Sequence, residues 1–138
     1  MITITDRAAL ISDLADFART TVNSQSGITG MALKGGLGAA TKAKPNIVEA
    51  GLGHVLNDVI GVLNPYWDSK PEGTSFGEQL DANKDRVAEE LLQVADGQSK
   101  SVTNQTLVKV YNSLRGKVAK VLAENVRGLG EVVEKHAA

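Results

Sequence analysis

His54 and Asp58 come nearest, by type and spacing, to residues that could do acid–base chemistry. They are four positions apart in a segment with helical spacing of apolar residues, so they could form an ion pair or a proton-transfer site. The sequence places no serine or third carboxylate to complete a mechanism, and His136 lies too near the end to favour a two-histidine metal site. A surface pair is the favoured interpretation, and a small ligand-binding or hydrolytic pocket near His54 is the alternative. We expect no catalytic, cofactor-binding or metal-ligating residues.

Residues 34–38, Lys-Gly-Gly-Leu-Gly, could hold a phosphate if their backbone N–H groups opened a helix. The known phosphate-binding patterns do not fit, because a P-loop requires Gly-Lys-Ser/Thr after a strand and a dinucleotide fold requires glycine where Thr41 stands. Close helix packing or a kink is therefore the favoured interpretation.

The last long helical segment is rich in basic residues, and Glu124 is the one acid among them. Candidate phosphate partners there are Lys109, Lys117, Lys120 and Arg127. No aromatic residues interleave with them for base stacking, so a solvated face is favoured over nucleic-acid or other anion binding.

Tyr66 and Trp67 follow Pro65 in a proline-containing segment. Exposed, the two rings would anchor a protein partner; buried, they would staple two halves of the chain together, which is the favoured interpretation in a sequence with only 4% aromatic residues. Val55 and Val59 belong to a wide apolar stripe on the preceding helix and are candidates for an exposed partner-binding surface.

Composition points to one ordinary globular domain, residues 1–138. Fifteen basic and sixteen acidic residues give a net charge of -1, which supplies no overall attraction to a polyanion or a membrane. Cysteine is absent, which excludes disulfides and agrees with a reducing compartment. The first residues lack a secretion signal, and we expect a cytoplasmic protein with no membrane partner.

Apolar residues recur at spacings of three and four along most of the chain, and no segment alternates with the two-residue period of a strand. We therefore predict an all-α fold: a compact bundle of five to seven helices in two halves, with the third and last long helices sharing the core. The halves would be joined by a connector over residues 64–75, which contains proline and the single tryptophan. The helices are predicted over residues 6–22, 28–43, 45–63, 76–80, 84–96 and from 103 or 104 to Gly128, with Gly97 and Gly130 as further helix ends and a final turn over 131–136.

The sequence resembles a family of small proteins of unknown function from actinobacteria over nearly its whole length. The resemblance depends on residues 27–34, 42–45, 64–67, 94–96, 111–116 and the closing 129–130 and 134–136. It implies a helical fold and a bacterial cytoplasmic setting, and it brings no catalytic residues. The favoured function is a non-catalytic protein-interaction or structural module, with an unknown protein partner or self-association.

Overall fold

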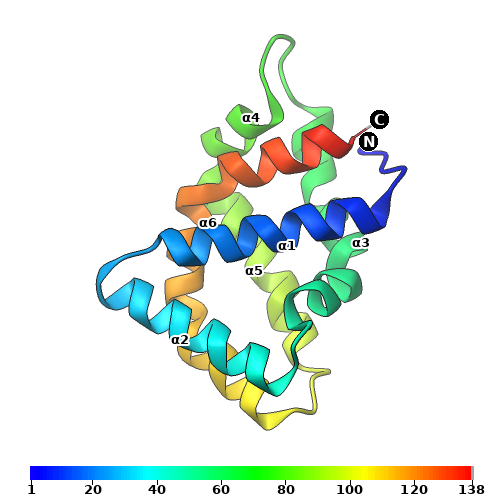
Figure 1. Ribbon diagram of the computed structural model, residues 1–138. Helices are drawn as coiled ribbons and strands as arrows, with labels where there is room; N and C mark the ends of the chain where they lie inside the picture. Colours follow the sequence, from blue (N-terminus) through cyan, green and yellow to red (C-terminus); the bar gives the residue numbers. More distant parts are fainter. Residues whose placement is uncertain (138) are drawn as a thin grey trace.

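The computed structural model describes residues 1–137, and this part of the chain is all-α, as predicted (Figure 1). An isolated antiparallel bridge between Ile4 and Ala137 brings the two ends of the described chain together. No helix within these residues is long and apolar enough to cross a membrane. The six helices described are α1 (Arg7–Ser24), α2 (Gly27–Ala43), α3 (Ile47–Asp68), α4 (Phe76–Ala82), α5 (Lys84–Ser99) and α6 (Gln105–His136).

Three of the helices begin at side-chain caps that satisfy otherwise unpaired backbone donors. At the start of α1, the Asp6 carboxylate accepts from the Ala9 N–H at 3.0 Å. Ser75 accepts from the Glu78 N–H at 3.1 Å, and Asn104 accepts from the first turn of α6. Asn83 precedes α5 but makes no such cap, because its side-chain amide donates to the Gln79 carbonyl instead.

The 32-residue helix α6 is the organising element of the bundle. It packs against α1, α2, α4 and α5, and Figure 1 shows it rising from the lower half, beside α2, to the upper half, beside α4. Helix α3 contributes to the same core cluster as α6, although α1, α4 and α5 lie between them. The largest fully buried side chains are Leu10, Leu56, Leu63, Phe76, Leu80, Val87, Leu92, Val126 and Val133.

The connector is shorter than predicted. Helix α3 continues through Pro65 and Trp67 to Asp68, so only residues 69–75, which contain Pro71, join α3 to α4. The prediction of a connector from residue 64 was wrong because proline is tolerated here in the last turns of a helix whose neighbouring side chains are buried. Gly73, with φ +82°, makes the turn in the remaining loop.

The glycines singled out in the sequence, at a predicted site of close packing or a kink and at predicted helix ends, all lie inside helices. Residues 34–38 are helical within α2, Gly97 lies inside α5, and α6 runs through Gly128 and Gly130 without a break. At three such sites the missing side chain lets elements approach closely. A Cβ on Gly36 would clash with Leu114, one on Gly128 would lie 2.6 Å from the Phe17 ring, and one on Gly130 would lie 2.7 Å from the Gly77 Cα.

Candidate partner-binding face

Tyr66 is part of the core and does not lie on an exposed face. Its side chain is 3% exposed, and its hydroxyl donates to the Glu90 carboxylate and accepts from the Arg86 Nε at 2.9 Å. Burial raises the pKa of Tyr66, and the hydrogen bond to Glu90 raises it further. Since these partners lie on α5, Tyr66 holds α3 against α5, which agrees with the staple interpretation.

Trp67 is half-buried and meets Phe76 edge to face, with ring centroids 5.0 Å apart. It thereby joins the end of α3 to the start of α4. Val55 and Val59 are also half-buried, and Val59 packs against the core. None of these three side chains is among the large apolar residues that stand out from the surface.

His54 is exposed on α3. Two surface hollows that the structure describes lie away from it: one surrounds the turn from α4 to α5, and the other is an open groove of about 520 Å³ along α5 and α6. This groove is lined by Lys84, Asp85, Ala88, Glu89, Ala119, Lys120, Ala123 and Glu124. Its lining mixes both charges with alanines, and no feature of it selects a particular ligand.

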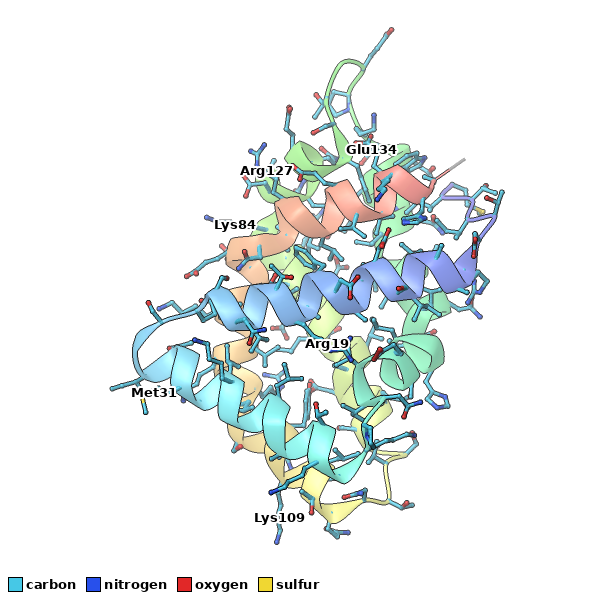
Figure 2. The ribbon with its side chains drawn as sticks, viewed as in Figure 1. Arg19, Met31, Lys84, Lys109, Arg127 and Glu134 are labelled. Carbon is cyan, nitrogen blue, oxygen red and sulfur yellow. The ribbon has the colours of Figure 1, made fainter. Side chains whose placement is uncertain are left out.

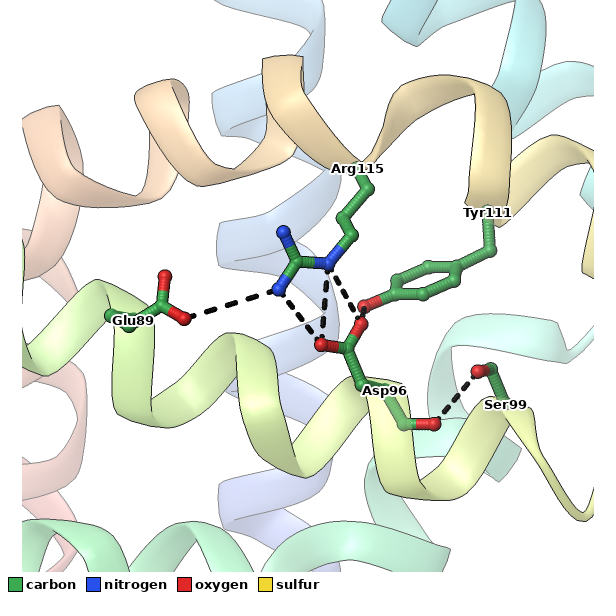
Figure 3. A network of polar contacts seen from close by, with 5 residues as sticks. All are labelled: Glu89, Asp96, Ser99, Tyr111 and Arg115. Atoms are coloured by element: carbon green, nitrogen blue, oxygen red, sulfur yellow. Dashed lines mark hydrogen bonds and ion pairs between the residues drawn. The ribbon is translucent and has the colours of Figure 1, made fainter.

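A polar network fastens α5 to the first half of α6 (Figure 3). Arg115 donates from Nε and Nη2 to the Asp96 carboxylate at 2.9 and 2.8 Å, and the Tyr111 hydroxyl donates to the same carboxylate at 2.5 Å. Arg115 and Tyr111 together lower the pKa of Asp96 to about 2, and Arg115 makes the larger contribution. Burial, followed by the bond to Asp96, raises the pKa of Tyr111 to about 12. The network orients the beginning of α6 and leaves neither Arg115 nor Tyr111 free for a ligand.

The Asp96 network predicts a titration in acid. Because the folded pKa of Asp96 is depressed from 3.8 to about 2, its contribution to stability is present above pH 3.8 and is lost as the pH falls toward 2. Replacing Arg115 with glutamine should raise the folded pKa of Asp96 more than Tyr111→Phe does, as measured by NMR titration of the Asp96 carboxyl carbon. Equal pKa values in the wild type and both variants would contradict this account of the network.

The basic residues proposed for anion binding do not share one environment. Lys109 and Lys120 are exposed on the first two-thirds of α6, and Lys117 is half-buried beside them. Arg127 lies farther along the helix and pairs with Asp81 of α4 at 3.2 Å. Figure 2 shows Lys109 and Arg127 in opposite halves of the molecule. Three of the four candidates therefore lie in the first half of α6, and the fourth belongs to the contact between α4 and α6.

The most prominent unpartnered surface lies on α2, where the sequence had suggested only a disfavoured phosphate site at residues 34–38. Ile28 is 83% exposed and Met31 is 77% exposed, and Figure 2 shows Met31 at the edge of the molecule. The face opposite the one packed on α6, here called the outward face of α2, is made of exposed residues alone: Ile28, Met31, Lys34, Gly35, Gly38, Ala39 and Lys42. Apart from its two lysines, this face is apolar or lacks side chains.

Comparison of the sequence with protein families identifies the family of this chain. Residues 2–137 match the model of a family of unknown function, DUF6918. The chain belongs to this family. The matched residues include all six helices of the bundle. No curated protein and no solved structure matches it.

Membership of DUF6918 assigns no residue a role, so the site rests on the geometry alone. The sequence did hold a signal for the outward face of α2: this helix contains no acidic residue and few large apolar ones, yet it is apolar on nearly every side. A helix buried on every side would show the same pattern. Only the structure separates the two sides, through the packing of Gly36 against α6 and the burial of Leu33.

Proposed function

We propose that this chain is a protein-interaction module that acts without catalysis in an actinobacterial cytoplasm, and that its docking surface is the outward face of α2. The observation that carries the proposal is the exposure of Ile28 and Met31, two large apolar side chains three positions apart on one helix. Isolated exposed apolar residues are common, but neighbouring ones beside glycines and alanine form a continuous apolar surface.

The packing of α2 supports this role. Its inward side is fixed on α6, where Gly36 lies against Leu114 and Val110, so the outward face is presented by a helix that is already ordered. A partner therefore meets a preformed surface, and little ordering of the backbone opposes binding. Met31 adds an unbranched side chain that can adapt to the shape of a partner.

Capture from an actinobacterial lysate tests the proposal. Wild-type protein is immobilised beside the double variant Ile28→Ser with Met31→Ser, and a control carries Asp58→Ser with Gln93→Ser, two exposed helical positions elsewhere. We expect a nuclease-resistant protein partner to be retained by the wild type and the control and reduced at least about tenfold by the α2 variant, since each apolar anchor contributes about 1.5–3 kcal/mol when fully buried. Equal recovery by all three proteins would refute the docking surface.

A further inference from the structure

The charge of this protein is divided unevenly along the chain. Residues 20–48 contain three lysines and no acid, and residues 97–123 contain four lysines, one arginine and no acid. These two stretches, here called the basic segments, hold eight of the fifteen basic residues and none of the sixteen acidic ones. The rest of the chain has seven basic and sixteen acidic residues, so a net charge of -1 conceals two oppositely charged parts.

The fold brings the basic segments together. Helix α2 and the first half of α6 pack side by side in the lower half of Figure 1, with Gly36 against Leu114 and Val110. Figure 2 shows Met31 and Lys109 projecting from this half, whereas Glu134 lies in the other. Among residues 1–137, no ion pair engages the seven lysines of the basic segments, namely Lys34, Lys42, Lys44, Lys100, Lys109, Lys117 and Lys120.

This charge pattern selects among partners for the outward face of α2. A second copy joined α2 to α2 would bring Lys34 and Lys42 of each chain toward those of the other, with no acid in the helix to compensate. Nucleic acid would contact the lysines through its phosphates, but α2 has no aromatic side chain on which a base could stack. Ile28 and Met31 would then stay in water. A protein surface that is both apolar and acidic satisfies the lysines and the apolar residues together.

The shape of the face narrows the partner further. A Cβ placed on Gly35 or Gly38 would meet nothing within 4 Å, so the backbone of α2 is directly accessible between Met31 and Ala39. Helices approach one another most closely where one of them lacks side chains, and a partner helix can then insert its own side chains into the space. Resting on the proposed function, we infer that the partner presents an amphipathic helix whose apolar stripe is flanked by acidic residues, and that it docks along the outward face of α2 with its acids opposite Lys34 and Lys42.

A charge-swap selection tests this inference. The bait is the full chain, and the probe is a displayed library of amphipathic helices of about 18 residues, long enough to be helical in water. Their apolar stripe is drawn from leucine, isoleucine and alanine, and the flanking positions encode glutamate, glutamine or lysine in equal amounts. Wild-type bait should enrich glutamate over lysine at the flanking positions by at least about fivefold, and Lys34→Glu with Lys42→Glu should reverse the preference.

Two further baits make the selection decisive. Lys84→Glu with Lys135→Glu, outside the basic segments, should retain the wild-type preference, and Ile28→Ser with Met31→Ser should recover no binders. Three outcomes would overturn the inference: the wild-type bait shows no charge preference, it recovers no binders, or it binds a DNA duplex more tightly than any selected helix. If lysate capture still depends on Ile28 and Met31 in that case, the interaction module stands and only the acidic helix falls; if capture does not depend on them, the module itself falls.

Discussion

Replacing Phe76 with alanine is expected to lower the free energy of unfolding by about 3–5 kcal/mol, the usual range for a fully buried phenylalanine. Phe76 opens α4, is 0% exposed and is the largest fully buried side chain. Its ring meets Trp67 edge to face, so the substitution removes the contact that ties the end of α3 to α4 as well as the buried area. With only seven residues, α4 has little stability of its own to keep it in place.

The control for Phe76→Ala is Met31→Ala. Met31 is also a large apolar side chain in a helix, but it is exposed where Phe76 is buried. The Met31→Ala substitution should change the free energy of unfolding by no more than about 0.5 kcal/mol, because it removes almost no buried contact. Urea denaturation followed by circular dichroism measures both variants. A large loss of stability from Met31→Ala would mean that Met31 is buried in solution and that the outward face of α2 is not free.

Gly130→Ala is expected to lower the free energy of unfolding by about 1–3 kcal/mol, although alanine is normally the better helix former. The added Cβ would lie 2.7 Å from the Gly77 Cα and 2.8 Å from the Gly77 nitrogen. Both are backbone atoms of α4, so neither can rotate away and α4 and α6 must separate. Gly77 is equally constrained, since its own Cβ would lie 2.7 Å from the Arg127 carbonyl oxygen.

A second glycine of the same helix provides the control for Gly130→Ala. Gly116 is exposed within α6, and a Cβ there would meet nothing within 4 Å. Gly116→Ala should therefore raise the free energy of unfolding by about 0.4–1 kcal/mol, because alanine restricts the unfolded chain without strain in the folded one. If both variants were stabilised in the same denaturation experiment, the close crossing of α4 and α6 would be wrong.

The positions of most helices could be predicted because their apolar residues follow the helical period strongly. The signals that failed were local breaks in that period. Pro65 costs a helix interior about 3 kcal/mol, yet α3 continues because Leu63 and Tyr66 on either side of it are buried in the core. Gly128 and Gly130 suggested a helix end. In the structure, Gly128 makes room for the Phe17 ring and Gly130 for the backbone of α4, and sequence spacing does not reveal either contact.

The candidate site was predictable only in part. The lysines of the last helix were visible as a cluster, but their extension by Lys34, Lys42 and Lys44 depends on α2 lying against α6, a contact between residues more than 70 positions apart. The sequence did not indicate that Ile28 and Met31 are exposed, because an apolar helix of small residues can equally be buried. Tyr66 was expected as a staple or an anchor, and its bonds to Arg86 and Glu90 fix it in the core.

The affinity of the captured partner for wild-type protein and for the Ile28→Ser, Met31→Ser variant tests the docking surface most directly. The two proteins should unfold at the same urea concentration, so any difference in affinity belongs to the outward face of α2. Loss of both apolar anchors is expected to raise the dissociation constant at least about 100-fold, from the apolar area that they would bury. An unchanged dissociation constant would show that the partner binds elsewhere and would contradict the assignment of α2 as the docking helix.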